Sequence, residues 1–263
     1  MDKRSIVGGT STAVVIEEKS IPVIDEQTAP LFNNLSISKD IDIPTYLQET
    51  YWWAYVHPAG VRFFERQWLV NLILWGNFSK LRDKAVEEIK SANSKNTLQI
   101  ACVYGDFTPK VSEVLPQDAV LDVVDVAPVQ LKNLSKKLNG QTNVQLHHQD
   151  STNLAFIENS YDNVIVFFLL HEQPADVRLK TIKEALRVIR PGGKLIFVDY
   201  HLPTVSNPFR YIMTPILKLL EPFALDMWRN EIADWVPSDI PIAKIQKETY
   251  FGGLYQKVII IKE

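Results

Sequence analysis

Cysteine, glycine and long apolar runs are scarce in this chain of 263 residues. The one cysteine, Cys102, excludes an internal disulfide and is typical of a reducing compartment. Cys102 lies within an apolar run, so we predict a buried structural thiol rather than a nucleophile. No apolar run approaches the roughly 20 residues that span a bilayer, and residues 1–19 lack the apolar core of a secretory signal. These absences predict a cytoplasmic protein.

An excess of either charge is also absent. The 28 Lys and Arg residues nearly balance the 31 Asp and Glu residues, which gives a formal net charge of −3 at pH 7. Nucleic-acid-binding domains usually carry a basic patch and have a pI above about 9. The composition therefore argues against a nucleic-acid partner, while 46% hydrophobic residues are sufficient for a substantial core.

The N-terminal third of the chain divides into two segments. Residues 1–40 mix Gly, Ser, Thr, Pro and Asn without a sustained period, which predicts a mobile arm. Residues 41–95 predict a helical cap, with eight aromatic residues between Tyr51 and Trp75. Such a stripe most often packs in a core. Its density also fits a cap that holds a flat apolar substrate or touches a membrane surface.

Residues 96–263 alternate apolar runs with helical stretches, which predicts a parallel sheet with crossover helices. Residues 203–240 interrupt this pattern with an apolar, Pro-containing insertion, for which we predict helices over 209–220 and 224–232. The last two apolar runs flank Gly252 and Gly253 and predict a β-hairpin. We expect a mostly parallel, seven-stranded α/β sheet that ends in an antiparallel hairpin. The five expected parallel strands cover residues 98–104, 120–126, 144–148, 161–170 and 194–200.

From Leu98 to Lys262, this order of elements resembles the Rossmann-like class I fold of S-adenosylmethionine (SAM)-dependent methyltransferases. The resemblance implies that Asp125, at the end of LDVVD, binds the ribose hydroxyls, since a carboxylate accepts two hydrogen bonds from a diol. It places Asp150 and Ser151 beside the adenine. The full set of cofactor-binding residues that we predict is Tyr104, Gly105, Asp106, Thr108, Asp125, Asp150 and Ser151.

The first loop, ACVYGDFT, departs from the acidic residue and glycine-rich GxGxG turn of these methyltransferases. With Gly105 aligned to the middle glycine, Ala101 takes the acidic position, and Val103 and Phe107 take the other two glycine positions. Bulky side chains there predict that SAM binds with its adenosine end retained and its methionine end displaced.

Four stretches of the chain together resemble the rhodoquinone-biosynthesis family RquA. They are YWWAYVHPAGVRFFERQWLVNLILWGNF, ACVYGDFT, FFLLHEQP and VDYH, and the resemblance runs from about Tyr46 to the C-terminus. It implies conversion of ubiquinone to rhodoquinone, in which SAM supplies an amino group that replaces a ring methoxy group and Mn²⁺ assists. It also implies that the two apolar segments guide the quinone tail, with peripheral contact at the inner face of the cell membrane.

Polar residues follow the fourth and fifth predicted strands, whose ends face the ligand crevice in such sheets. We predict His171, Glu172, Asp199 and His201 as ligands of Mn²⁺, which accepts oxygen and nitrogen donors. The alternative is that His171 caps a strand and that Asp199 is a loop partner. Tyr104 and His171 are the candidates for proton transfer or positioning in catalysis.

Two other functions remain open from the sequence. The first alternative is transfer of a methyl group to a quinone precursor or another lipid, and the second is a non-catalytic subunit that binds SAM or a quinone. The presence of Asp125, Asp150 and the adjacent His171 and Glu172 argues against the non-catalytic subunit, because a chain that has lost ligand binding has no physical need for these residues.

Overall fold

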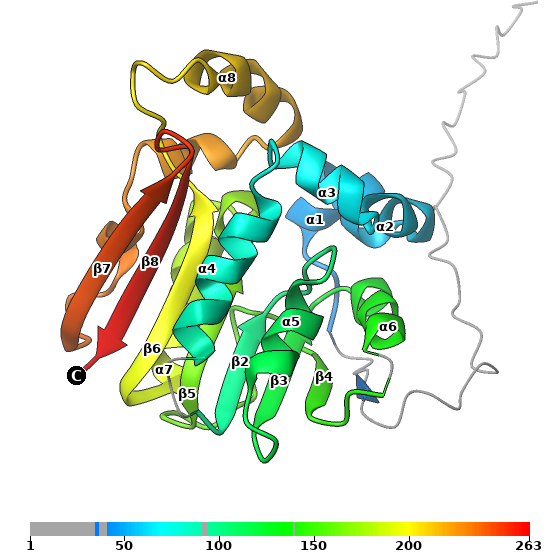
Figure 1. Ribbon diagram of the computed structural model, residues 1–263, viewed down its shortest axis with the longest axis vertical. Coiled ribbons are helices and arrows are strands. Elements are labelled where there is room, and N and C mark those ends of the chain that lie inside the picture. The colour runs from blue at the N-terminus through cyan, green and yellow to red at the C-terminus, as the bar shows by residue number, and fades with distance from the viewer. Residues whose placement is uncertain (1–34, 37–40, 91–93, 139) are drawn as a thin grey trace, which may run out of the picture. The chain divides into compact units, whose positions relative to one another are not determined.

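The computed structural model describes residues 35–36, 41–90, 94–138 and 140–263. In this part of the chain, eight strands form one sheet in the order β1-β4-β3-β2-β5-β6-β8-β7 (Figure 1). The strands are β1 Leu35–Ser36, β2 Asn96–Ile100, β3 Val120–Asp125, β4 Val144–His148, β5 Tyr161–Phe167, β6 Ile189–Tyr200, β7 Ile242–Tyr250 and β8 Tyr255–Lys262.

The central strands pair in parallel because helices connect them. α5 (Phe107–Val114), α6 (Pro128–Lys137) and α7 (Ala175–Val188) follow β2, β3 and β5. α4 (Phe78–Lys90) and α5 cover the near face of the sheet in Figure 1, and α7 lies behind it. All seven residues of β5 are therefore buried, as expected for a strand covered on both faces.

The sheet edge formed by the last two strands of the chain is antiparallel, as the sequence predicts. β8 pairs antiparallel with both β6 and β7, and the tight turn between β7 and β8 contains Gly252 and Gly253, both with positive φ. The predicted seven-stranded fold is thus confirmed. β1 adds two residues to the opposite edge, parallel to β4. The remainder of the predicted arm, residues 1–34 and 37–40, lies outside the described residues.

The aromatic segment forms short helices rather than one long one. They are α1 (Thr45–Thr50), the π-helix η1 (Trp52–Val56), α2 (Pro58–Phe64) and α3 (Gln67–Ile73). Trp75 and Gly76 both have positive φ, so the chain turns sharply before α4. Tyr51 is buried whereas Trp68 is exposed, so the aromatic residues supply both core and surface.

The insertion contains one regular helix, α8 (Phe209–Leu220), with the predicted bounds. The helix predicted over 224–232 is instead two 3₁₀ turns, η3 (Ala224–Trp228) and η4 (Ile232–Trp235). In the described ranges, no helix has the length and apolar character needed to cross a bilayer.

Candidate active site

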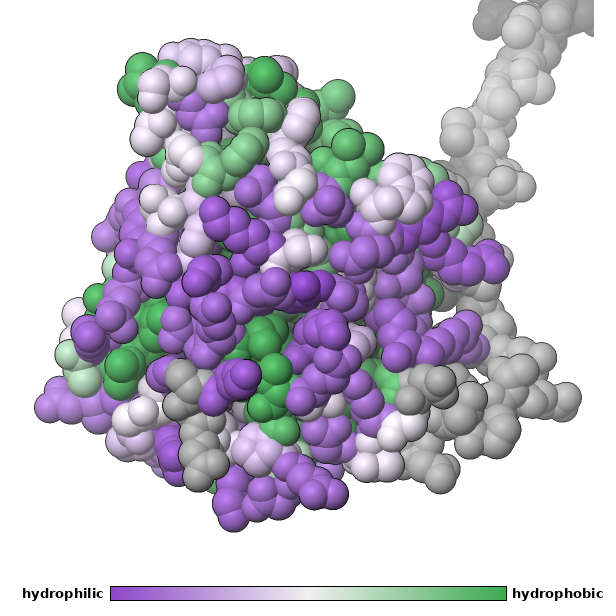
Figure 2. All heavy atoms as spheres, viewed as in Figure 1, coloured by the Kyte–Doolittle hydropathy of each residue, from purple (hydrophilic) through white to green (hydrophobic). Residues whose placement is uncertain are grey.

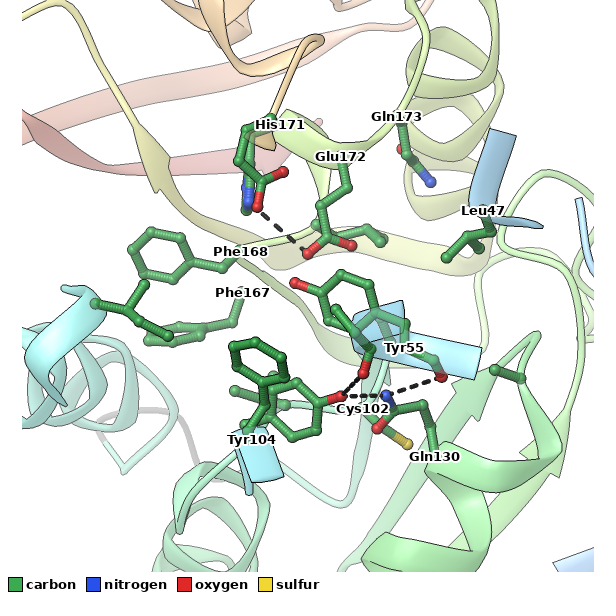
Figure 3. A pocket seen from close by; sticks show the side chains of 18 of the residues that line it. Leu47, Tyr55, Cys102, Tyr104, Gln130, Phe167, Phe168, His171, Glu172 and Gln173 are labelled. Atoms are coloured by element: carbon green, nitrogen blue, oxygen red, sulfur yellow. Dashed lines mark hydrogen bonds and ion pairs between the residues drawn. The ribbon is translucent and has the colours of Figure 1, made fainter. Parts of the chain in front are cut away.

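A cavity of about 550 Å³ lies at the carboxyl ends of β2, β3, β4 and β5, where open α/β sheets bind their ligands. Its walls include residues 101–104, 125–127 and 149–151, together with residues that follow β5. Side chains of the cap and of α8 complete the lining. Figure 3 shows His171, Glu172 and Gln173 along one side of this cavity and Tyr104, Cys102 and Gln130 along the other.

The residues predicted to bind adenosine lie together in this cavity. Asp125 accepts hydrogen bonds from the backbone N–H groups of Cys102 (2.7 Å) and Ala127 (2.8 Å). Burial raises the pKa of the Asp125 carboxyl, and these two donors oppose the rise. Asp150 and Ser151 line the cavity beside it. A carboxylate oxygen can accept two hydrogen bonds, so Asp125 Oδ1, which accepts the Ala127 N–H, can also accept a ribose hydroxyl.

The loop after β2 differs from the sequence alignment at Ala101. Its φ is 72°, in the left-handed region that favours glycine. Ala101 therefore takes a glycine-type position, and placing it at the acidic position is wrong. Cys102 lies in this turn, beyond the end of β2, and is half-buried. Burial, followed by the charge of Asp125, raises the pKa of its thiol well above the ordinary value, so the thiol stays protonated.

Two N–H groups of this loop are bonded to the cap. Gly105 N–H donates to Glu65 Oε1 (3.0 Å), and Asp106 N–H donates to Gln67 Oε1 (3.1 Å). Lys137 pairs with Glu65 at 2.9 Å and also donates to the Val103 and Gly105 carbonyls. The cap thus places the Glu65 carboxylate against the loop, so the loop does not form an open anion-binding site.

Three predicted cofactor residues are consequently absent from the cavity lining. Gly105 faces Glu65 and Gln67, the Asp106 carboxylate pairs with Arg82 at 2.6 Å, and Thr108 is fully buried in α5. The structure does not bring these three residues into the cavity, and their role as SAM contacts stays a prediction.

Tyr104 lines the cavity, but its hydroxyl already makes two hydrogen bonds within the protein. It donates to the Ala54 carbonyl (2.6 Å) and accepts from Gln130 Nε2 (2.8 Å). Its ring stacks on Tyr55 with 5.7 Å between ring centroids. Burial raises the pKa of Tyr104 far above its ordinary value. These contacts join the loop to the cap, and a part in proton transfer stays a prediction.

His171 is buried and oriented by Asp199. His171 Nδ1 lies 2.9 Å from Asp199 Oδ1, and Asp199 Oδ2 accepts the backbone N–H groups of Leu170 (2.9 Å) and His171 (3.3 Å). Burial opposes the charged imidazole, but the carboxylates of Asp199, Glu221 and Glu172 outweigh it and raise the pKa of His171 to about 9. The imidazole is therefore cationic near neutral pH.

Two further carboxyl groups share this end of the cavity. Glu172 Oε1 lies 3.8 Å from His171 Nε2, and Glu221 stands at the C-terminal end of α8. Burial raises the pKa of both, in Glu172 to about 8. The sequence analysis did not select Glu221. The available signal was an acidic residue that ends an otherwise apolar helix.

The four predicted metal ligands do not converge. His201 Nδ1 bonds the Gly253 carbonyl (2.8 Å), and its Nε2 lies 2.8 Å from Lys247 Nζ, which places it against the terminal hairpin. Asp199 is occupied by backbone N–H groups and by His171. The described residues contain no group of three or more His, Cys, Asp or Glu placed to hold a metal ion. The predicted four-ligand Mn²⁺ site is therefore wrong in this structure.

Comparison with known proteins identifies relatives for most of the described chain. A model of the ubiE/COQ5 methyltransferase family matches residues 67–233. A demethylmenaquinone methyltransferase of Staphylococcus epidermidis is 25% identical over 197 residues, which cover 73% of this chain and 80% of that protein. The Staphylococcus saprophyticus enzyme of the same name is 29% identical over 136 residues, 52% of this chain and 58% of its own length.

Solved structures agree on the fold. An O-methyltransferase family protein from Burkholderia thailandensis superimposes with a TM-score of 0.56, covers 74% of this chain and 59% of its own, and is 14% identical. The [4+2]-cyclase SpnF gives a TM-score of 0.51 at 15% identity, with coverage of 70% and 80%. At these identities, the similarity concerns the fold alone.

Proposed function

Because the chain belongs to the ubiE/COQ5 methyltransferase family, a family of SAM-dependent, quinone-related methyltransferases, we propose a specific reaction for it. The protein converts ubiquinone to rhodoquinone, replacing a ring methoxy group with an amino group donated by SAM.

The observation that carries this proposal is the occupied loop after β2. Glu65 and Gln67 accept the N–H groups of Gly105 and Asp106, which a methyltransferase of this fold leaves available to the methionine end of its cofactor. Asp125 and Asp150 remain in the cavity for adenosine. A SAM molecule held this way keeps its adenosine anchor and turns its methionine end. That pose suits donation of the amino nitrogen better than donation of the methyl group.

The cavity also offers the chemistry that amination of a quinone ring requires. Phe167, Phe168 and Leu217 line it and can pack against a flat ring. The cationic His171 can donate a proton to a quinone carbonyl oxygen, which makes the ring carbon more electrophilic. The attacking amine has to be neutral, so a nearby carboxylate must accept its proton. The nitrogen bonds to the ring carbon as the methoxy group leaves as methanol. The bond between this nitrogen and Cα of SAM then breaks with loss of a Cβ proton, which gives the aminoquinone and an unsaturated acid.

The rhodoquinone resemblance implies Mn²⁺ as well. Since the described residues gather no metal-binding group, no step of this proposal passes through a metal. Running the assay below with and without Mn²⁺ tests the requirement directly.

A mass measurement tests the proposed reaction. With SAM labelled by ¹⁵N at its α-amino group and ubiquinone as acceptor, we expect the product quinone to have lost a methoxy group and gained the label. The relatives are named as demethylmenaquinone methyltransferases, so methyl transfer is the second candidate. A product one methyl group heavier, formed together with S-adenosylhomocysteine, would show methyl transfer and refute amination.

A polyprenyl quinone resides in a membrane, and apolar side chains surround the cavity rim. Trp68 and Leu72 on α3 and Leu219 on α8 are 60%, 60% and 81% exposed. Figure 2 shows hydrophobic residues gathered over α3 and α8. Their position supports peripheral contact with the inner face of the cell membrane through these two helices.

Vesicle flotation tests this contact. We expect the double variant Leu72→Glu, Leu219→Glu to lose binding to anionic lipid vesicles, because two charges then enter the apolar interface. Ile157→Glu is the matched control: Ile157 is equally exposed but precedes β5, at the opposite end of the sheet from the cavity. Equal flotation of the double variant and the control would contradict membrane docking through α3 and α8.

A further inference from the structure

The cavity contains an excess of acidic groups. Asp125, Asp150, Glu172 and Glu221 line it, and among its described lining residues there is no Lys or Arg. His171 is its one basic side chain, and Asp199 already bonds its Nδ1 atom. Burial raises the pKa of Glu172 and Glu221, so a cation that enters beside them favours their ionised forms, and the cavity prefers a cationic ligand to an anionic one. SAM carries two positive groups, the sulfonium and the α-ammonium, against a single carboxylate.

Two acceptor oxygens in the cavity have no hydrogen-bond partner. Gln173 is 1% exposed, and its Nε2 donates to Ser151 (3.2 Å) and Thr181 (3.0 Å), while its Oε1 is unpartnered. Glu221 Oε2 is also buried and makes no hydrogen bond of good geometry with the described residues, although the Tyr51 hydroxyl interacts with this carboxylate. Buried acceptors rarely remain unpaired in folded proteins. Both residues line the cavity, so a ligand with N–H donors would satisfy them.

The sheet order places these acceptors within reach of a ligand anchored at Asp125. Asp125 ends β3, Glu172 and Gln173 follow β5, and β2 lies between these strands. Two strand spacings separate β3 from β5, or about 10 Å. The amino-acid chain of SAM can bridge from a ribose at β3 to the end of β5. It cannot use the N–H groups of the loop after β2, because Glu65 and Gln67 already occupy them.

We propose that Glu172, Glu221 and Gln173 form a subsite for a primary ammonium group, the α-ammonium of SAM. This inference rests on the SAM binding proposed above and adds the place where the amino nitrogen is held. The three N–H donors of an ammonium match three acceptor side chains. The subsite turns the methionine end away from the loop and toward β5 and α8, where Phe168 and Leu217 offer an apolar surface for the acceptor ring.

Calorimetric titration of the full chain with three adenosine ligands tests this subsite without any acceptor quinone. The ligands are S-adenosylhomocysteine, its deamino analogue and methylthioadenosine, which lacks the whole amino-acid group. In the unaltered protein, we expect removal of the amino group to weaken binding about tenfold or more, since charge-assisted hydrogen bonds are lost. In Glu221→Gln, we expect S-adenosylhomocysteine to bind about tenfold more weakly while the affinity of the deamino analogue stays unchanged.

Equal weakening of both ligands by Glu221→Gln would overturn the proposal, because the carboxylate would then act on the cavity as a whole. Glu172→Gln provides a second variant with the same expected pattern if Glu221→Gln does not fold. Glu65→Gln is the matched control, since Glu65 is a carboxylate at the loop. If Glu65→Gln and not Glu221→Gln abolished the preference for the amino group, the ammonium would bind at the loop and the proposal would fail.

The titrations are performed in EDTA, so that a metal ion cannot bridge ligand and carboxylates. An effect of Glu221→Gln that appears only with added Mn²⁺ would overturn the direct contact. The outcome is separable from the amination assay: ¹⁵N missing from the quinone refutes amino transfer, whereas loss of the ammonium preference in Glu221→Gln supports the subsite whichever group is transferred.

Discussion

Replacing Asp125 by alanine is expected to weaken SAM binding by about 1–3 kcal/mol, or roughly 5–150-fold in Kd. The substitution removes the carboxylate proposed to bind the ribose hydroxyls. It also frees the backbone N–H groups of Cys102 and Ala127, which Asp125 now accepts at 2.7 and 2.8 Å. Because those bonds hold the turn after β2 against the end of β3, the cavity wall loosens as well. Calorimetric titration with SAM measures the change.

Asp118→Ala is the matched control for this prediction. Asp118 precedes the same strand at its opposite end, where it makes an exposed ion pair with Lys95. Such surface pairs contribute little, so SAM affinity should stay the same. Unchanged SAM affinity in Asp125→Ala would remove Asp125 from the binding site.

Replacing Arg178 by methionine is expected to lower the free energy of unfolding by about 2–4 kcal/mol. Arg178 is 0% exposed, and its guanidinium donates to the carbonyls of Leu170 (2.8 Å), Gln173 (2.9 Å) and Phe223 (3.2 Å). Methionine leaves all three carbonyls without this donor. The buried guanidinium also costs desolvation energy, and this burial lowers the pKa of Arg178. We expect the free energy lost with the three hydrogen bonds to exceed the desolvation energy that methionine recovers.

Urea denaturation measures this loss, with Arg229→Met as the control. The Arg229 side chain is 74% exposed, so its replacement should change stability by less than about 0.5 kcal/mol. An Arg178→Met midpoint equal to that of the control, with an unchanged denaturant slope, would show that the buried guanidinium contributes no net stability.

The same bonds make Arg178 a positioning residue for the site. Leu170 and Gln173 flank His171 and Glu172 in the turn after β5, and Phe223 lies two residues beyond Glu221. Arg178 thus joins the two segments that carry the acidic end of the cavity. Its substitution should weaken the preference for an ammonium-bearing ligand as well as the fold.

Local patterns were sufficient to predict most of the sheet. β5 ends in the apolar run Val164–Phe167, and α8 has the predicted bounds because its apolar residues follow the helical period over three turns. The positions of Asp125 and Asp150 were predictable for the same reason, since Asp125 ends β3 and Asp150 lies two residues beyond β4. The short 3₁₀ turns of the insertion were missed because they have no strong period of their own.

Contacts between distant residues were not predictable. Gly105 and Glu65 are 40 positions apart, and no local pattern shows that a carboxylate from the cap accepts the loop N–H. The metal prediction failed in the same way: His201 and Asp199 share a strand end, but the terminal hairpin binds His201 and the turn after β5 binds Asp199.

The glycine-poor loop after β2 shows which features are local in the sequence and which depend on the tertiary structure. By itself, the sequence determined the α/β sheet and the place of Asp125 and Asp150 at strand ends beside the cavity, because apolar periodicity and strand ends are local properties of the chain. It also showed that Val103 and Phe107 stand where glycines are expected. Only the tertiary structure decided that Glu65 accepts the loop N–H of Gly105 and that Glu172 and Glu221 line one cavity, because these residues come from three separate segments that folding alone brings together.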